Sequence, residues 1–230
     1  MKGFHFLLAF SLLFLTSEAN NLKANSLELI PAKTESLLKV NQSLIENKVK
    51  TLKLHPFAYK KPTTPFAYEI RVISASDYQA QKPANALPFD AGYLGSNGVI
   101  VVSAPNTPEQ IAVFKDIDQV ALFYLCQSYI RYYYVDSEMP LWFKYGFAAF
   151  EAHLQFSDAI IKTALTSYGG TISSFSILND PNTFVAKNGI ALAYMFGEFM
   201  SVYHCWQYNY ILSTNAQSIE VSSWWWETET

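Results

Sequence analysis

Hydrophobic and polar positions change their period near the middle of the chain, from short alternating runs to long helical runs. Residues 67–74 (AYEIRVIS) alternate well enough to predict a half-buried strand. The dipeptide Asn97-Gly98 lies between the short apolar runs 92–94 and 99–103, and it favours a two-residue hairpin turn. These runs predict a strand that is followed by a β-hairpin.

Two segments beside these strands carry the side-chain spacing that begins helices. Ser76-Asp77-Tyr78-Gln79 has the spacing of a capping box. Thr107-Pro108-Glu109-Gln110 combines a cap, a proline in the first turn and a glutamine three residues after the cap. We therefore expect one short helix near Ser76 and a second helix that begins after Thr107.

Apolar residues with helical spacing dominate the second half of the chain. They predict helices over residues 111–134, 141–156, 157–167 and 189–207, with a loop over residues 172–185. The order of elements predicts an α+β fold, in which a small N-terminal sheet with a hairpin precedes a helical half.

The first 19 residues have the three-part pattern of a secretory signal peptide. Met1-Lys2 is positive, residues 6–15 are apolar, and Ser17-Glu18-Ala19 places small residues where signal peptidase cleaves. The apolar run is about half of the roughly 20 residues that span a bilayer, which favours cleavage over an uncleaved anchor. We expect a mature chain that begins near Asn20, has no transmembrane anchor, and is secreted or enters a periplasm or cell envelope.

The remaining chain divides by composition. Residues 20–65 are polar and lysine-rich, with one amphipathic helix predicted over residues 35–54 and a proline-containing linker over residues 60–65. Residues 66–212 are expected to form the compact domain. Residues 213–230 form an aromatic tail with three consecutive tryptophans, which is either a docking element or a truncated end.

Charge and motif content exclude several classes of function. The net charge is −3 and no basic stripe is present, so nucleic-acid binding has no electrostatic support. No two histidines after residue 19 are three or four positions apart, so no helix presents a histidine pair to a metal. Phosphate-binding loops and G-x-S-x-G are also absent from the sequence. The two cysteines, Cys126 and Cys205, either form a disulfide or are separate buried thiols.

Four segments in a fixed order carry a family resemblance. They cover residues 92–106, 120–130, 139–152 and 188–203. The third segment fits a P-x-W-[LF]-x-E-G-[LF]-A-x-[YF] pattern at every defined position except the glutamate. The fourth segment fits A-Y-x-x-[GA]-x-[FY]. The matching residues are Pro140, Trp142, Phe143, Gly146, Phe147, Ala148 and Phe150, followed by Ala193, Tyr194, Gly197 and Phe199. Across Tyr68–Tyr208 the chain thereby resembles the peptidase-MA-like group of gluzincin, thermolysin-like zinc metallopeptidases.

The resemblance implies a cleft-lining strand, a helix that carries H-E-x-x-H, and a second helix with the third zinc ligand. In this register Leu122 and Cys126 replace the two histidines, Phe123 replaces the general-base glutamate, and Tyr145 replaces the third ligand. A zinc site needs three donor side chains and an open position, and Phe123 cannot accept a proton from water. We therefore expect no catalytic residue and no bound zinc, with a hydrophobic plug in place of the metal pocket.

The first functional hypothesis is a secreted, non-catalytic domain that binds extended peptide along an edge strand formed by Val99, Ile100, Val101 and Val102. The second is an active zinc metallopeptidase whose ligands lie in another register. The third is a structural or envelope-surface protein without a ligand.

Several other side chains have chemistry of their own. Glu151 and His153, with the upstream acids Asp136 and Glu138, suggest a relocated metal site, although positions two apart point to different sides of a helix. Glu198 is a candidate for a lone buried acid. Cys126 is a candidate reactive thiol that apolar neighbours would make inert. The tyrosines of residues 129–134 offer rings for stacking on a sugar or a peptide.

Overall fold

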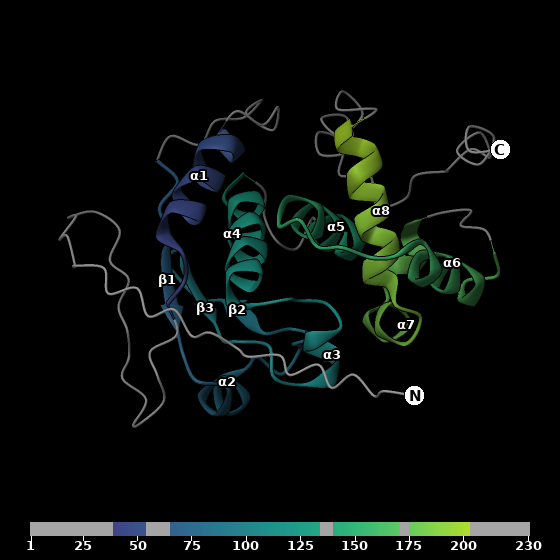
Figure 1. Ribbon diagram of the computed structural model, residues 1–230, viewed down its shortest axis with the longest axis horizontal. Helices are drawn as coiled ribbons and strands as arrows, with labels where there is room; N and C mark the ends of the chain where they lie inside the picture. The colour runs from purple at the N-terminus through teal and green to yellow at the C-terminus, as the bar shows by residue number, and fades with distance from the viewer. Residues whose placement is uncertain (1–38, 54–64, 134–139, 171–174, 203–230) are drawn as a thin grey trace, which may run out of the picture.

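The computed structural model describes residues 39–53, 65–133, 140–170 and 175–202 (Figure 1). The fold is mixed α/β and mostly helical, with one small sheet in the first half, which agrees with the predicted order of elements. The predicted signal peptide, the linker before Pro65 and the aromatic tail lie outside the described residues.

Three short strands form the sheet in the order β1-β3-β2. Strand β1 (Glu69–Val72) runs parallel to β3 (Val99–Val102), and β2 (Gly92–Leu94) runs antiparallel to it. Strand β1 is shorter than the alternating pattern predicts because the chain leaves the sheet at Ser74. The Ser74 hydroxyl accepts a hydrogen bond from the Asp77 N–H at 3.0 Å and begins helix α2 (Ala75–Gln81) slightly earlier than expected.

The predicted hairpin is confirmed. Asn97 and Gly98 both have left-handed backbone conformations, with φ values of 55° and 79°. Asparagine and glycine adopt this region more readily than other residues, so this dipeptide allows β2 to turn directly into β3. A side chain at Gly98 would also meet the carbonyl oxygen of Ala67, at 2.6 Å from its Cβ.

The helix predicted over residues 111–134 is in fact two helices. Thr107 and Gln110 form the expected capping box, but the resulting α3 (Pro108–Ile111) ends after one turn. The chain then buries Phe114 and restarts as α4 (Ile117–Tyr133), where the Asp116 carboxylate accepts from the Gln119 N–H at 2.9 Å. Residues 121–130 of α4 are all buried, so this part of the helix is covered on every side, including at the polar residues Gln127 and Ser128.

The later helices are α5 (Leu141–Glu151), α6 (Asp158–Ser167), α7 (Pro181–Ala186) and α8 (Gly189–Val202). Helix α5 ends earlier than predicted because His153 takes a left-handed conformation with φ of 54°. The loop predicted over residues 172–185 is wrong from Phe175 onward. A 3₁₀-helix at Phe175–Asn179 is followed by α7, which is capped by Asp180.

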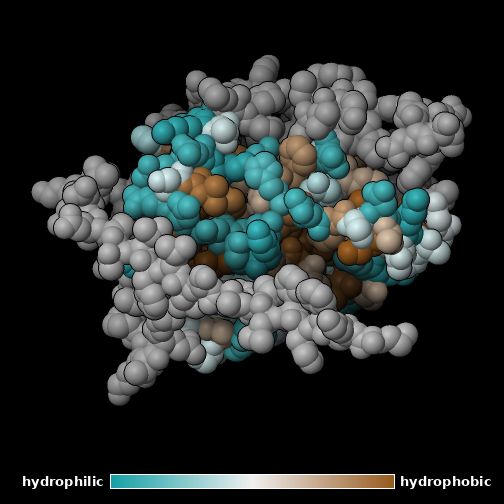
Figure 2. Space-filling model, viewed as in Figure 1, coloured by the Kyte–Doolittle hydropathy of each residue, from teal (hydrophilic) through white to brown (hydrophobic). Residues whose placement is uncertain are grey.

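Helix α1 (Gln42–Lys53) belongs to the compact domain, contrary to the boundary predicted at residue 66. Ile45, Val49 and Leu52 are buried in the same core as α4 and α5. Its hydrophilic side covers one part of the face shown in Figure 2, and hydrophobic atoms are visible in the recessed middle of that face. Helix α1 therefore completes the core rather than forming a separate polar segment.

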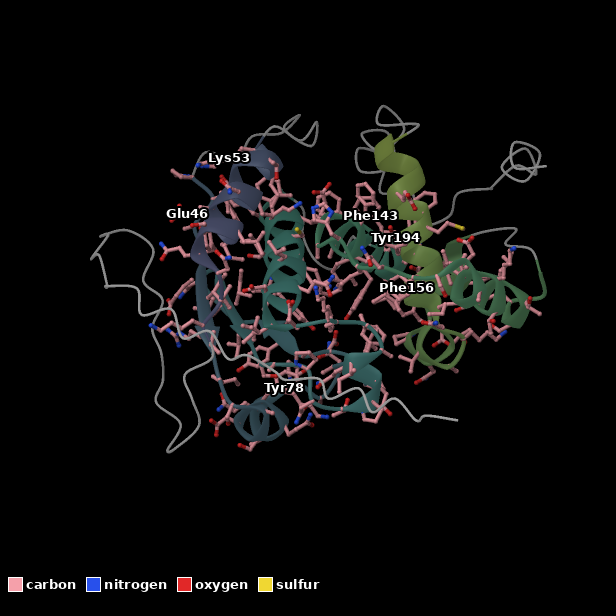
Figure 3. The ribbon with its side chains drawn as sticks, in the orientation of Figure 1. Glu46, Lys53, Tyr78, Phe143, Phe156 and Tyr194 are labelled. Carbon is pink, nitrogen blue, oxygen red and sulfur yellow. The ribbon has the colours of Figure 1, made fainter. Side chains whose placement is uncertain are left out.

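The core lies mainly between α4, α5 and α8. Gly146 of α5 permits the closest approach, because a Cβ at this position would lie 2.3 Å from the Ala193 carbonyl oxygen of α8. Phe156 packs beside Tyr194 with the two rings tilted by 56° and their centroids 5.4 Å apart (Figure 3). A smaller cluster around Tyr78 and Val101 covers the other side of the sheet.

Candidate functional site

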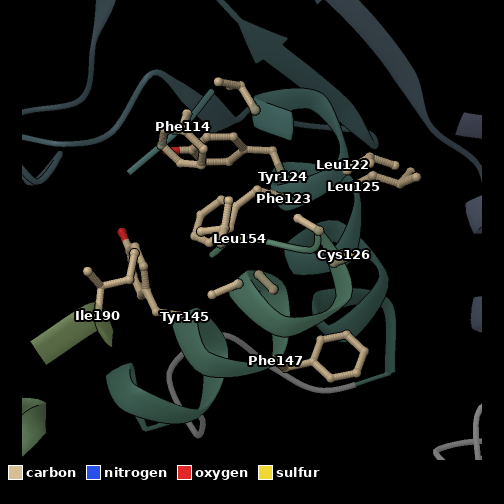
Figure 4. Packing of buried hydrophobic residues seen from close by; sticks show 14 of the residues in the cluster. Phe114, Leu122, Phe123, Tyr124, Leu125, Cys126, Tyr145, Phe147, Leu154 and Ile190 are labelled. Carbon is tan, nitrogen blue, oxygen red and sulfur yellow. The ribbon is translucent and has the colours of Figure 1, made fainter. Parts of the chain in front are cut away.

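The structure brings two of the four positions that the resemblance assigned to a zinc site into direct contact. Phe123 of α4 and Tyr145 of α5 have ring centroids 5.7 Å apart, and both side chains are buried. Figure 4 shows these two rings pointing toward the same space, while Leu122 projects on another side of α4 beside Leu125. Leu122 is therefore part of the core but does not meet Tyr145.

Cys126 is buried at a third place in the core and is a free thiol. Burial raises the pKa of this thiol, and the nearby Glu151 carboxylate raises it further while Lys48 acts in the opposite direction. A raised pKa keeps the sulfur protonated and unreactive, which contradicts the reactive-thiol hypothesis. Cys205 lies outside the described residues.

The hydroxyl of Tyr145 is bound to a carboxylate that the sequence did not single out. It lies 3.2 Å from both carboxylate oxygens of Asp90, and the hydroxyl of Tyr124 lies 2.7 Å from one of them. The backbone N–H of Leu87 donates to the other oxygen at 2.7 Å. Asp90, which is itself only 5% exposed, thus links α4 and α5 to the turn that precedes β2.

Burial dominates the electrostatics of this cluster. It raises the pKa of Asp90 to about 6, although the hydrogen bonds from Tyr124, Leu87 and Tyr145 act in the opposite direction. Burial also raises the pKa values of Tyr124 and Tyr145, and the neighbouring Asp90 adds to both effects. Both phenols therefore stay protonated and donate to the carboxylate. The nearby Tyr78 hydroxyl is buried without a hydrogen-bond partner among the described residues.

Zinc does not fit the side chains at the family positions. Leu122 and Phe123 offer no donor atom, and the Tyr145 hydroxyl already donates to Asp90. Over the described ranges, no group of three or more histidine, cysteine, aspartate or glutamate side chains has the geometry to hold a metal ion.

The other candidate residues have separate environments. Glu151 forms an ion pair with Lys48 of α1 at 3.1 Å, while His153 is exposed. The imidazole is nevertheless partly shielded from water, and this desolvation lowers the pKa of His153. The positive charge of Lys48 lowers it further. Asp136 and Glu138 lie outside the described residues, so the relocated metal site stays a prediction. Glu198 is exposed, which contradicts the buried-acid hypothesis.

The tyrosines of residues 129–134 divide between the core and the surface. Tyr129 is fully buried, and Tyr132 is half-buried with its ring centroid 5.4 Å from that of Phe66. The next two side chains are not described.

The expected edge strand is the central strand. The residues of β3 pair with β1 on one side and with β2 on the other, so their backbone groups already have partners. An edge strand at residues 99–102 would require β3 to lie at the border of the sheet. Because β3 also pairs with β1, the strand of the hairpin at the border of the sheet is β2.

Strand β2 has backbone groups on its outer side that no other described strand pairs, at Gly92, which is buried, and at Leu94, which is half-buried. Ala91 and Gly95 are hydrogen-bonded to β3 through their backbone atoms, at 2.8 Å each. Because hydrogen-bonded positions alternate along an antiparallel strand, the N–H and C=O groups of Gly92 and Leu94 point away from β3. No other strand of the described residues pairs with them.

Comparison with known proteins adds no relative: no family model, no curated protein and no solved structure matches this chain. Within the described part of the chain, no helix is long and apolar enough to cross a membrane.

Sequence reasoning missed Asp90 and the outer position of β2. Asp90 lies between the helix predicted near Ser76 and the predicted hairpin, and its partners Tyr124 and Tyr145 are 34 and 55 residues away. No local pattern links such distant residues. The sequence of β3 did contain a signal, because the unbroken apolar run Val99–Val102 is more typical of a central strand than of an edge strand.

Proposed function

We propose that this chain is an exported, non-catalytic domain with a thermolysin-like scaffold that binds an extended peptide along the outer side of β2. The observation that carries the proposal is the outward direction of the Gly92 and Leu94 backbone groups. Addition of a peptide strand requires such groups and needs neither a metal nor a catalytic side chain.

The side chains beside this strand support binding rather than hydrolysis. In the register of the resembled family, Phe123 stands where the general base is expected and cannot accept a proton. Tyr145 stands at the third ligand position, and its hydroxyl donates to Asp90. The Asp90 carboxylate accepts hydrogen bonds from both tyrosines and from the Leu87 N–H, which leaves it in a structural role.

Leu94 offers a direct test of strand addition. Proline at this position removes an outward N–H but no hydrogen bond of the β2–β3 ladder, while Leu94→Ala keeps the N–H. Wild-type protein, Leu94→Pro and Leu94→Ala are compared for retention of random hexapeptides, and the affinities of retained peptides are measured by fluorescence anisotropy. We expect binding to weaken about tenfold in Leu94→Pro and by less in Leu94→Ala, which keeps the outward N–H and only shortens a side chain of the binding strand.

The same purified proteins separate the competing hypotheses. Absence of any retained peptide on the wild type rejects strand addition and favours a structural or surface role. Stoichiometric zinc that is lost on mutation of His153 or Cys126 would support the metallopeptidase alternative. Circular dichroism and thermal unfolding of each variant show whether the Leu94 substitutions have altered the fold itself.

A further inference from the structure

Tyr93 lies in the middle of β2, and its side chain points to the side of the sheet that faces α2. It is opposite Val101 of β3 and packs with it in the small cluster around Tyr78. Its neighbour Leu94 points to the other side and packs against the main core, because side chains alternate along a strand. The outward backbone groups of Leu94 and the side chain of Tyr93 are therefore neighbours at the border of the sheet.

The ring of Tyr93 is held in place but is not fully covered. It stacks on the buried ring of Tyr78, with the centroids 6.4 Å apart and an angle of 28° between the ring planes. The residue as a whole is half-buried, so part of its side chain remains exposed to solvent. A ring whose orientation is already fixed loses little conformational entropy when a ligand packs against it. Tyr93 is therefore a preorganised apolar contact beside the outer side of β2.

The row of side chains that crosses the sheet through Tyr93 is apolar at the border of the sheet. It continues from Tyr93 to Val101 on β3 and then to Arg71 on β1. Arg71 is two strands away from Tyr93, at about 10 Å, and it pairs with Glu69 of its own strand at 2.6 Å. The neighbours of Tyr93 within this row therefore favour an apolar rather than a charged side chain in any strand that is added beside β2.

A peptide strand that pairs with Leu94 places one of its side chains directly beside Tyr93. Side chains of facing residues in neighbouring strands point to the same side of the sheet, with Cβ atoms about 4.5–5.5 Å apart. This distance lets a peptide side chain pack against the exposed part of the Tyr93 ring. Aromatic and β-branched side chains gain most from such a cross-strand contact with an aromatic ring.

We infer that Tyr93 selects the peptide that pairs with β2, by packing against an aromatic or β-branched apolar side chain at one peptide position. The inference rests on the proposed function and specifies its ligand. The peptide residues on either side of this position point to the opposite side of the sheet, so Tyr93 does not contact their side chains. The preferred ligand is therefore an extended segment with one such side chain opposite Tyr93, rather than a uniformly apolar peptide.

Alanine substitution within a bound peptide tests this contact. Random hexapeptides that are retained by the purified wild-type protein are sequenced by mass spectrometry, and each position of a tight-binding peptide is replaced by alanine in turn. Fluorescence anisotropy measures the affinity of every replacement. We expect one position, occupied by an aromatic residue, valine or isoleucine, at which alanine weakens binding about five- to tenfold.

Variants of Tyr93 show whether this position lies beside its ring. Tyr93→Thr keeps a side chain suited to a strand but removes the ring, so the original peptide should bind about five- to tenfold more weakly. Replacing the selected peptide position by alanine should then cause little further loss. Tyr93→Phe keeps the ring and should bind as the wild type does. Tyr68→Thr is the matched control, because the half-buried Tyr68 also stacks on a neighbouring ring, that of Phe66, but directly precedes β1 at the other border of the sheet.

Nuclear magnetic resonance gives a second measurement that needs only the wild-type protein. We expect nuclear Overhauser effects between the ring protons of Tyr93 and the selected side chain of the bound peptide. An equal loss from the alanine replacement in wild type and Tyr93→Thr, or Overhauser effects from that side chain to Leu94 and not to Tyr93, would overturn the inference while leaving binding along β2 intact. Absence of any retained peptide on the wild type would instead reject the proposed function, and the inference with it.

Discussion

The Tyr145 hydroxyl lies 3.2 Å from each carboxylate oxygen of Asp90, and this contact joins α5 to the turn that precedes β2. Tyr124 binds the same carboxylate from α4 at 2.7 Å. Helices α4 and α5 each supply a hydroxyl, and the carboxylate comes from the turn that precedes β2. The result is a polar contact that fixes β2 relative to the two central helices.

Removal of the Tyr145 hydroxyl tests this contact. Tyr145→Phe leaves the ring in place but deprives the buried carboxylate of one donor, so we expect a loss of about 1–2 kcal/mol in the free energy of unfolding. Urea denaturation measures this value. Tyr194→Phe is the matched control, because the half-buried Tyr194 hydroxyl makes no hydrogen bond with a described residue. Equal stabilities of the two variants would show that the Asp90 contact contributes nothing.

The pKa of Asp90 predicts an unusual dependence of stability on pH. Burial raises this pKa from 3.8 to about 6, so between these values the folded protein binds a proton that the unfolded chain has released. The contribution of Asp90 to stability is therefore complete below about pH 4 and falls by up to about 1.4 kcal/mol per pH unit as the pH rises toward 6. Urea denaturation from pH 4 to pH 7 is compared for wild type and Asp90→Asn. The difference between the two proteins must change across this window, and parallel curves would contradict the assignment.

The parts of the fold that could be predicted from the sequence depend on short local patterns, in which the interacting residues are only a few positions apart. Asn97-Gly98 placed the hairpin, and the spacing of Thr107 and Gln110 placed the start of α3. Helix α7 was missed, although Asp180 and Pro181 form a cap and a first-turn proline that are a local signal for the start of a helix. The break between α3 and α4, where Phe114 is buried, had no local signal, since the helical spacing continues across it.

Contacts between distant segments explain what the sequence did not predict. Parallel pairing of β1 with β3 made the expected edge strand central. The apolar run of β3 favours a central position, but nothing local in either strand shows that β1 is its partner. Asp90 became the centre of a buried cluster through partners on two later helices. In both cases the environment is created by packing, so the residue type alone does not reveal the role.

Gly146 provides a test of the closest helix contact. A methyl group at this position would lie 2.3 Å from the Ala193 carbonyl oxygen, which is backbone and cannot turn aside. Gly146→Ala must therefore separate α5 from α8, and we expect a loss of more than about 3 kcal/mol in the free energy of unfolding. Gly95→Ala is the control, because its nearest contact would be an ordinary 3.4 Å. Thermal and urea unfolding measure both variants, and a stable Gly146→Ala protein would show that α5 and α8 are not packed this closely.

The ion pair between Lys48 and Glu151 predicts how firmly α1 is held in the domain. The two groups are 3.1 Å apart with side chains only 10% and 14% exposed, so neither charge is well solvated if its partner is lost. Lys48→Met keeps the length of the buried chain but removes the ammonium, and we expect a loss of about 2–3 kcal/mol in the free energy of unfolding. The double variant Lys48→Met/Glu151→Met removes both charges and should regain most of that stability. Lys50→Met, at an exposed position of the same helix, is the control and should change stability by less than about 0.5 kcal/mol. If the double variant is as unstable as the sum of the single variants, the two charges are not coupled and α1 is held by its apolar side chains alone.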